Sequence, residues 1–456
     1  MDKLPSKAWI CPVCGYIHYG PEPPEECPVC GTEKGLFEPY TEPEAVLPTT
    51  GAAIKVVIAG AGIAGVSAAE ALRKASPQAE ITLISNEALF PYYRMNLTRY
   101  LAGEVGIDQL DLHPQSWYAD NRITLLTGCE LRRIDLAKKE LTLQDDRRIA
   151  FDKLILTIGA YPFLPPFPGA SLRNVCTVRT RKDIDFLLEV CPECETCVCI
   201  GGGLLGLETA GALARRGLDV TVLENQAWLL PRQLNQAAGK LFQQRIKPLG
   251  ITVRTQARTR EITGSDKVSS VLLEDGATIP ADLVVISAGI RSNVDLARAA
   301  GLAVNQGVMV DDNMQTSHPD VFAAGDVAEH NGTIYGIWPP AQFQGAIAGM
   351  NAAGQAAEFA GIPRSNTLKV LGYDLFSIGQ INAAGADDQV IDAEWDNQYA
   401  CFVFHAAQMV GSILMGEISL SNKVKAAIEN HIDFSTLLNK KPGAKDIESF
   451  LLTLNN

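Results

Sequence analysis

Short apolar runs rich in β-branched residues recur along the chain, and each is followed by glycines and then by a helical pattern. The run at 54–60 has this order, and a further apolar run follows at 80–85. The same order returns in a run at 197–200, a helical segment at 204–216 and an apolar run at 219–224. Apolar runs of roughly four to eight residues that alternate with helical segments are typical of parallel sheets in α/β proteins. The pattern predicts an α/β fold built around two parallel sheets.

The first glycine cluster, Gly60, Gly62 and Gly65, stands between a predicted strand and the helical pattern after it. Glycines in this position let a pyrophosphate approach the N-terminus of the helix, where free N–H groups and the helix dipole favour negative charge. Glu87 follows the next apolar run, where an acidic side chain can bind a pair of ribose hydroxyls. The segment therefore predicts a dinucleotide site.

The second glycine cluster repeats this arrangement with Gly201, Gly203 and Gly206, and Glu224 ends the strand that follows. Two bound nucleotides are therefore expected. A carboxylate at the strand end accepts hydrogen bonds from the 2′ and 3′ hydroxyls of NADH and repels the extra phosphate of NADPH. We expect NADH to be preferred; Arg232 would weaken this preference if it reached that phosphate.

Three more apolar segments enter glycine turns, at 154–169, 283–293 and 316–328. With the paired glycine motifs they resemble the two-dinucleotide-fold flavoprotein reductases of the pyridine-nucleotide disulfide oxidoreductase superfamily, from residue 54 to about 360. The resemblance implies that the first motif takes FAD and the second takes NADH. It places Gly60, Gly62, Gly65, Glu87, Arg94, Gly159, Gly325 and Asp326 at FAD, and Gly201, Gly203, Gly206, Glu224 and Gly289 at NADH.

The resemblance also implies a glutathione-reductase-like division into domains. The expected parts are a small metal domain at 1–41, a linker at 42–52, an FAD-binding domain at 53–165 and 282–362, an NADH-binding domain at 166–281 and a C-terminal α+β domain at 363–456. Strand patterns at 368–379, 392–399 and 400–416 and helical patterns at about 421–431 and 444–454 define that last part. In several relatives it forms a dimer surface or covers the flavin, so a homodimer is one expectation.

Four cysteines near the N-terminus form two copies of one short motif. Cys11 and Cys14 enclose Pro-Val and precede a glycine, and Cys27 and Cys30 do the same. Four thiolates from two such turns offer tetrahedral coordination, which suits zinc or a single iron, and a purely structural zinc ribbon is the alternative. Residues 8–38 resemble the rubredoxin-like domain of rubrerythrins, which implies one iron that carries one electron.

The segment at 91–103 indicates what kind of flavoprotein reductase this is. No cysteine occurs between residues 63 and 103, so a catalytic thiol at the flavin is not expected. The segment resembles the flavoproteins that reduce rubredoxins and ferredoxins, and the FAD region of large nitrite reductase subunits. By this resemblance Arg94 lies along the FAD, and Arg99 pairs with Glu208 beside the flavin as the candidate catalytic residues. An ordinary structural ion pair is the alternative.

A second group of cysteines, Cys191, Cys194, Cys197 and Cys199, could be interpreted as another metal site. Cys197 and Cys199 lie two apart on a predicted buried strand, so they point to one face and are expected to pack as small apolar side chains.

The segment 337–354 is predicted to be a helix that begins at a proline pair and is rich in small residues. Its N-terminus could stabilise a reduced flavin through the helix dipole, and close packing by small residues is the alternative.

Composition and charge exclude several classes of function. The 456 residues carry 39 basic and 52 acidic side chains, a net charge of −13, so nucleic acid and anionic membranes are unexpected partners. No apolar run reaches the ~20 residues of a membrane span. The N-terminus lacks a signal-peptide pattern, and eleven cysteines form no regular framework, so a reducing cytoplasmic setting is expected. The six histidines form no catalytic cluster.

These observations predict an FAD-dependent NADH:rubredoxin-type oxidoreductase with its acceptor domain fused at the N-terminus. Hydride would pass from NADH to FAD, and electrons would then pass singly to the Cys11, Cys14, Cys27 and Cys30 iron and on to a downstream rubredoxin, rubrerythrin or diiron oxygen reductase. Two alternatives stay open. One is an NADH oxidase, or a reductase of another carrier, that docks through a zinc ribbon, and the other is a non-enzymatic NADH-responsive binding protein.

Overall fold

The computed structural model describes residues 7–13, 15–29, 31–41, 53–361 and 365–454. Cys14, Cys30 and the linker expected at 42–52 lie outside the described residues. The chain divides into two compact units. Unit 1 comprises Met1–Leu97, Val105–Phe163 and Gly289–Ile362, and unit 2 comprises Thr98–Glu104, Leu164–Ala288 and Pro363–Asn456. No helix in the described part of the chain combines the length and apolar character needed to cross a membrane.

The centre of unit 1 is a five-stranded parallel sheet with the order β22-β10-β4-β5-β6. Its strands are β4 (Lys55–Ala59), β5 (Glu80–Ile84), β6 (Ile123–Leu126), β10 (Lys153–Leu156) and β22 (Val321–Ala323). In β4 Val56, Val57 and Ile58 are at most 1% exposed, as expected for a parallel sheet covered on both faces. Ala59 at the end of β4 pairs with Leu156 of β10 and Ile84 of β5. The carboxyl end of β4, where the first glycine motif begins, therefore lies level with the carboxyl ends of β10 and β5.

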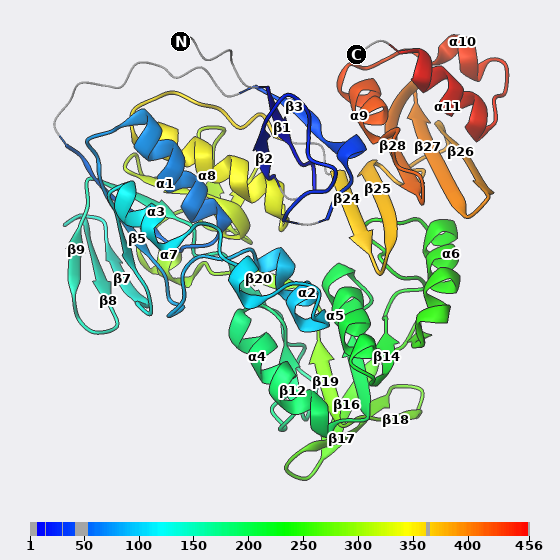
Figure 1. Ribbon diagram of the computed structural model, residues 1–456, viewed down its shortest axis with the longest axis horizontal. Coiled ribbons are helices and arrows are strands. Elements are labelled where there is room, and N and C mark those ends of the chain that lie inside the picture. The colour runs from blue at the N-terminus through cyan, green and yellow to red at the C-terminus, as the bar shows by residue number, and fades with distance from the viewer. Residues whose placement is uncertain (1–6, 14, 30, 42–52, 362–364, 455–456) are drawn as a thin grey trace. The chain divides into compact units, whose positions relative to one another are not determined.

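Two helices of unit 1 pack closely against each other, α1 (Ile63–Ala75) and α8 (Trp338–Ala352) (Figure 1). A Cβ on Gly345 would lie 2.1 Å from the Ala64 carbonyl oxygen, and one on Gly349 would lie 2.3 Å from that of Ala68. The small residues predicted in this helix therefore permit the close approach of two backbones. The role of the helix dipole toward the flavin stays a prediction.

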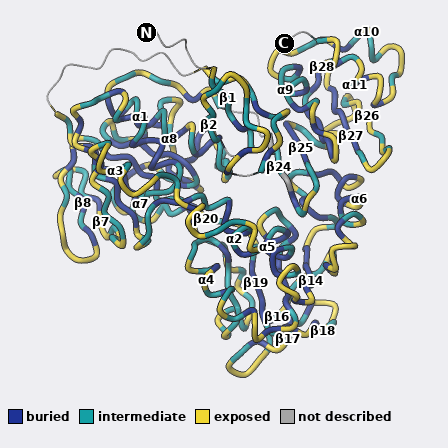
Figure 2. Tube along the Cα trace, in the orientation of Figure 1, coloured by how far each residue is buried: buried dark blue, intermediate teal, exposed yellow. Residues whose placement is uncertain are grey.

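The rest of unit 1 consists of short elements around this core. They are η2 (Arg94–Asn96), η3 (Ile107–Gln109), α3 (Gln115–Asp120), β7 (Leu131–Asp135), β8 (Glu140–Leu143), β9 (Arg148–Ala150), β11 (Ala160–Pro162), β20 (Ile290–Ser292), α7 (Asp295–Ala299), β21 (Val308–Val310), η6 (Gly325–Val327) and β23 (Ala328–His330). Buried residues concentrate inside both units, and the loop between β8 and β9, at 144–147, is among the exposed segments (Figure 2).

Unit 1 also contains a small antiparallel sheet at the N-terminal end of the chain. Its strands β1 (Ala8–Ile10), β2 (Ile17–Tyr19) and β3 (Glu38–Tyr40) have the order β2-β1-β3, and η1 (Lys34–Leu36) precedes β3. Cys11, Cys27, Val29 and Phe37 form the buried core of this small domain.

Unit 2 repeats the parallel five-stranded arrangement with the order β12-β19-β13-β14-β15. Its strands are β12 (Val175–Thr177), β13 (Thr196–Ile200), β14 (Asp219–Leu223), β15 (Ile251–Arg254) and β19 (Leu283–Ile286), and an antiparallel sheet is formed by β16 (Thr259–Gly264), β17 (Val268–Leu273) and β18 (Thr278–Pro280). The helices are α4 (Arg181–Val190), η4 (Cys191–Glu193), α5 (Leu204–Arg215), α6 (Gln236–Ile246) and η5 (Lys247–Leu249), and α2 (Leu97–Ala102) begins at the last residue of a unit 1 segment. The predicted α/β class with two Rossmann-like sheets is confirmed.

The C-terminal part of unit 2 is an antiparallel sheet of order β24-β25-β28-β27-β26 with helices after it. The elements are β24 (Ser365–Val370), β25 (Tyr373–Gly379), β26 (Asp388–Trp395), β27 (Gln398–His405), β28 (Gln408–Met415), α9 (Ser421–Glu429), α10 (Ser435–Leu438) and α11 (Ala444–Thr453). The three predicted strand segments give five strands, because each contains a two-residue hairpin turn and β27 runs from the second segment into the third. The turn pairs, Leu371 with Gly372, Asp396 with Asn397, and Ala406 with Ala407, all have positive φ, as tight hairpins require.

Candidate nucleotide and metal sites

The first glycine motif forms the turn from β4 into α1. The Gly60 N–H donates to the Ile84 carbonyl oxygen at 2.8 Å, and Gly60 has a φ of +110°. A Cβ on Gly65 would lie 1.9 Å from the Gly60 carbonyl oxygen, whereas a Cβ on Gly62 would meet no atom within 4 Å. Gly60 and Gly65 thus close the strand-helix junction, and Gly62 opens the backbone at the start of α1. This cradle fits the pyrophosphate of FAD.

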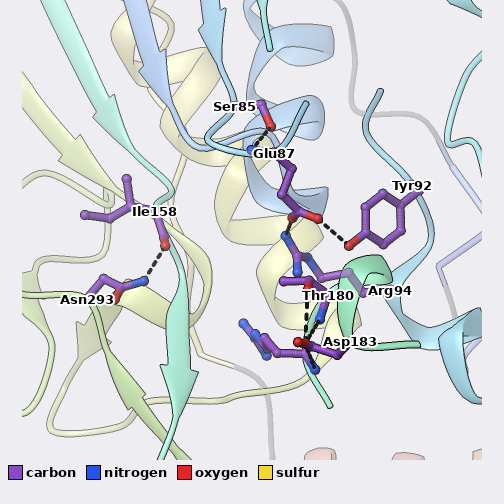
Figure 3. Close-up of polar contacts among 9 residues, drawn as sticks. Ser85, Glu87, Tyr92, Arg94, Ile158, Thr180, Asp183 and Asn293 are labelled. Carbon is purple, nitrogen blue, oxygen red and sulfur yellow. Dashed lines mark hydrogen bonds and ion pairs between the residues drawn. The ribbon is translucent and has the colours of Figure 1, made fainter. Parts of the chain in front are cut away.

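Glu87 lies in the loop after β5, where it binds Tyr92 and Arg94 (Figure 3). One carboxylate oxygen accepts from the Tyr92 hydroxyl at 2.7 Å, and the other forms an ion pair with the Arg94 guanidinium. The Arg94 guanidinium also lies over the Tyr92 ring, 5.3 Å from its centroid. The structure therefore groups Glu87 and Arg94, two of the three charged residues expected at FAD, and adds Tyr92.

The remaining residues expected at FAD surround the ends of β10 and β22. The Gly325 N–H donates to Gln344 Oε1 at 2.9 Å, and the Asp326 carbonyl oxygen accepts from Ser292 Oγ at 2.6 Å. Gln344 is 1% exposed, yet its Nε2 has no hydrogen-bond partner among the described residues. A buried unmatched donor beside the Gly-Asp pair fits a polar ligand such as the FAD chain.

Gly159 and Gly289 both lie in unit 1, beside the paired strands β11 and β20. The Gly159 carbonyl oxygen accepts from the Asn293 N–H at 2.9 Å, and Asn293 Nδ2 donates to the Ile158 carbonyl oxygen at 2.7 Å (Figure 3). The Gly289 carbonyl oxygen accepts from the Phe163 N–H at 2.8 Å. Gly289 was expected at NADH, but it falls in the unit that contains the first glycine motif and not in the unit of Gly201. Its contact with NADH stays a prediction.

The second glycine motif has the same backbone geometry as the first. The Gly201 N–H donates to the Leu223 carbonyl oxygen at 2.8 Å, and a Cβ on Gly206 would lie 2.1 Å from the Gly201 carbonyl oxygen. Gly203 precedes α5 and has no atom within 4 Å of its Cβ position. The turn therefore provides a second open cradle, which fits the pyrophosphate of NADH.

Glu224 is buried behind this turn at the end of β14. Its Oε2 accepts from the Gly202 N–H at 2.8 Å, and its Oε1 accepts from the Gln226 N–H at 2.7 Å. The carboxylate therefore holds the glycine turn in place, and its remaining lone pairs are the ones that ribose hydroxyls would use. Elsewhere in unit 2, Asp183 of α4 accepts from the Thr180 N–H at 2.7 Å and caps that helix (Figure 3).

The expected pairing of Arg99 with Glu208 is not the contact that the structure shows. Glu208 Oε2 accepts from Thr98 Oγ1 at 3.1 Å, and Arg99 Nε lies 3.2 Å from Glu104 Oε2. Glu104 also forms an ion pair with Arg215 of α5. The physical reason is that Glu104 is closer to Arg99 along the chain and offers it a solvent-accessible carboxylate. Glu208 instead accepts a hydrogen bond from the hydroxyl of Thr98. A catalytic role for Arg99 and Glu208 stays a prediction.

Glu208 should make the stability of the protein depend on pH near neutrality. Burial raises the pKa of its carboxyl to about 7, and the Thr98 hydrogen bond opposes the rise. Between pH 4.5 and 7 the folded chain then holds a proton that the unfolded chain has lost, so this group's contribution to stability falls as pH rises. We expect Glu208→Gln to raise stability by about 1 to 3 kcal/mol more at pH 8 than at pH 5. Thermal unfolding at both pH values, with exposed Glu193→Gln as the matched control, measures the effect. Equal shifts at the two pH values would contradict it.

The two cysteine knuckles have matching backbone turns. The Gly15 N–H donates to the Cys11 carbonyl oxygen at 2.8 Å, and the Gly31 N–H donates to that of Cys27 at 2.9 Å. Both glycines have a φ of +72°. Cys11 and Cys27 are buried, while Cys14 and Cys30 lie outside the described residues. Two equivalent turns with buried thiols fit a single metal ion bound by four sulfurs.

Five cysteines of unit 2 are buried: Cys191, Cys194, Cys197, Cys199 and Cys401. Cys197 and Cys199 on β13 are at most 1% exposed, and burial raises the pKa of the Cys197 thiol well above its usual value. Burial also raises the pKa of Cys191 to about 11 and that of Cys401 to about 12. Thiols that stay protonated are poor nucleophiles and poor metal ligands.

Sequence reasoning missed several polar residues that join distant segments. Thr98 binds Glu208, Gln344 binds Gly325, Asn96 binds the Val29 carbonyl oxygen and Gln342 binds the Gly15 carbonyl oxygen. None of them belongs to a motif. The one sequence signal was the helical pattern predicted at 337–354, which contains Gln342 and Gln344 but did not single them out.

Family models match most of the chain. One described as pyridine nucleotide-disulphide oxidoreductase matches residues 54–345. A rubredoxin NAD+ reductase C-terminal domain matches residues 365–432, and a rubrerythrin rubredoxin-like domain matches residues 9–38.

Individual relatives agree with these matches. An NAD(P)H nitrite reductase of Bacillus subtilis is 35% identical over 84% of this chain and 48% of its own length. The chain thus spans about half the length of the first curated relatives, or less. An NADH-rubredoxin oxidoreductase of Clostridium acetobutylicum is 30% identical over 84% of this chain and 96% of that protein. The solved structure of NADH:rubredoxin oxidoreductase from Clostridium acetobutylicum covers 87% of this chain and 99% of its own with a TM-score of 0.74 and 28% identity.

The two glycine cradles and the Gly-Asp turn fall within the match at 54–345, and the paired cysteine knuckles fall within the match at 9–38. The chain belongs to the pyridine nucleotide-disulphide oxidoreductase family and carries a rubredoxin-like domain at its N-terminal end and a rubredoxin NAD+ reductase C-terminal domain at the other.

Proposed function

We propose that the protein is an FAD-dependent NADH oxidoreductase that passes electrons singly to its own rubredoxin-like iron centre and on to a rubredoxin- or rubrerythrin-type acceptor. The observation that carries the proposal is that the cysteine knuckles and the first glycine cradle fold into the same compact unit. A relative named NADH-rubredoxin oxidoreductase, 96% of which is covered by the match, supports it. When bound, FAD would accept a hydride from NADH and release electrons one at a time, which no side chain can do.

The chain's own residues would bind and orient the two nucleotides. Gly62 and the N-terminus of α1 would hold the FAD pyrophosphate, with Glu87 at the ribose and Gly325 and Asp326 at the ribityl chain. Gly203 and the N-terminus of α5 would hold the NADH pyrophosphate. Glu224 would receive the adenosine ribose hydroxyls and exclude a 2′-phosphate, so NADH would be the better donor.

NADH delivers two electrons and the iron takes one. Complete turnover therefore needs a second oxidised acceptor, either another chain's iron or a downstream redox protein. The fusion keeps the first acceptor at a high local concentration, so its reduction would not depend on encounters between molecules.

Anaerobic rapid mixing of the holoprotein with NADH tests the proposal. We expect flavin absorbance to bleach before or together with the ferric-thiolate absorbance, at a rate independent of protein concentration. The catalytic efficiency with NADPH should be lower than that with NADH by roughly tenfold or more. Two outcomes would overturn the electron relay and indicate a structural or docking role for the small domain. One is that the protein holds zinc after expression with ample iron, and the other is that iron reduction is second order in protein.

A further inference from the structure

One short segment of unit 1 contacts both the nucleotide motif and the cysteine knuckles. In residues 93–96, Arg94 binds Glu87 beside the first glycine cradle. Tyr93 and Met95 pack against the buried core of the small domain. Tyr93 also stacks on Trp338, the first residue of α8, with ring centroids 5.7 Å apart. The segment is therefore a continuous packed connection from the FAD side of the unit to the metal side.

Asn96 binds the second knuckle from this segment. Its Nδ2 donates to the Val29 carbonyl oxygen at 2.8 Å, and the side chain is 2% exposed. Val29 immediately precedes Cys30, so the hydrogen bond reaches the backbone of the knuckle itself. A buried amide that gives its donor to a knuckle carbonyl fixes position, because losing the bond would leave buried polar groups unmatched.

Gln342 of α8 binds the first knuckle. Its Nε2 donates to the Gly15 carbonyl oxygen at 3.3 Å. A Cβ at Gly15 would lie 1.9 Å from Gln342 Oε1, so the end of this side chain lies directly against the knuckle glycine. Each knuckle thus receives one amide donor, from two segments that are 246 residues apart in the chain but belong to the same unit.

We propose that Asn96 and Gln342 are positioning residues that seat both cysteine knuckles on the FAD-binding part of unit 1, so that the small domain accepts electrons as a docked domain. The proposal rests on the proposed function for its electron-transfer role, and on the observed contacts for the docking itself. A tether alone raises local concentration but leaves the orientation of the acceptor open. Two directed hydrogen bonds and the packing of Tyr93 and Met95 would set that orientation.

Isosteric substitutions test whether Asn96 and Gln342 dock the small domain on the rest of unit 1. Asn96→Asp and Gln342→Glu keep size and remove the donor, and they place a negatively charged oxygen against a carbonyl oxygen. In the holoprotein that carries both changes, we expect amide hydrogen exchange to increase in peptides that cover 15–20, 31–37 and 93–96. We also expect electron transfer from flavin to iron to slow by roughly tenfold or more, while reduction of FAD by NADH changes less than about twofold.

Two further variants separate positioning from a general effect of the charge change. Gln315→Glu makes the same amide-to-carboxylate change in unit 1 and loses a 3.1 Å hydrogen bond to the Pro319 carbonyl oxygen, and it should leave both readouts unchanged. Gln342→Lys supplies a new donor for the Gly15 carbonyl oxygen and should keep much of the transfer rate and exchange protection that Gln342→Glu loses.

The outcomes distinguish the docking proposal from the proposed function. If hydrogen exchange and the transfer rate in the double variant equal those of the wild type, the docking proposal is wrong. If the wild-type iron is not reduced but exchange increases in the double variant, the docking stands and the electron relay fails. If Asn96→Asp loses FAD, the partly exposed Gln342→Glu variant decides alone, and unchanged exchange and rate in it would overturn the proposal.

Discussion

Replacing Gly60 with alanine is expected to prevent FAD retention and to lower the free energy of unfolding by more than about 3 kcal/mol. Gly60 has a φ of +110°, which L side chains rarely adopt, and a Cβ there would lie 2.1 Å from the Thr157 carbonyl oxygen. Thr157 cannot easily move away, because its N–H donates to the Ala59 carbonyl oxygen at 2.8 Å and its hydroxyl donates to the Gly60 carbonyl oxygen at 2.7 Å. Flavin absorbance after gel filtration and thermal unfolding of the purified protein measure the two effects.

Gly62→Ala is the matched control for this change. Gly62 has a φ of −76°, and its Cβ would meet no atom within 4 Å, so the variant should fold like the wild type. The added methyl group would occupy the space through which a pyrophosphate approaches α1. The affinity for FAD should therefore fall by roughly tenfold or more. The assignment of the cradle is wrong if Gly60→Ala keeps its FAD and its melting temperature, or if Gly62→Ala binds FAD as the wild type does.

Replacing Cys11 and Cys27 with serine, one in each knuckle, is expected to remove the metal and to leave flavin reduction intact. Metal content should fall from roughly one ion per chain to below about a tenth, since two of four thiolates are lost. The ferric-thiolate absorbance and its reduction by NADH should disappear. The rate of FAD reduction should change less than about twofold, because the parallel sheets of both units contain none of these four cysteines.

Cys129→Ser and Cys401→Ser are matched controls for the loss of a thiol, since neither cysteine belongs to a knuckle. Metal content and both reduction steps should match those of the wild type in these variants. Loss of FAD reduction in the Cys11 and Cys27 variant, with FAD still bound, would show that the small domain acts on the flavin itself and is more than an electron acceptor.

The sequence by itself was enough to predict the elements whose signals are local. A β-branched run, a glycine cluster and a helical pattern occupy consecutive residues, so both dinucleotide turns could be located together with Glu87 and Glu224 at the ends of the next strands. The cysteine knuckles were equally clear, because each ligand pair and its glycine fall within five residues. The C-terminal hairpins were less clear, because turns such as Ala406-Ala407 adopt positive φ without glycine or asparagine to mark them.

The tertiary structure decided which side chains meet across long separations in the chain. Glu208 accepts a hydrogen bond from Thr98, 110 positions away, and Arg99 forms an ion pair with Glu104. In each case the packed backbone brings these two side chains together. The contacts of Asn96 with Val29 and of Gln342 with Gly15 span 67 and 327 positions. Asparagine and glutamine carry no motif, and their role depends on an amide donor that meets a carbonyl only after folding, so the seat of the metal domain could be found only in the folded chain.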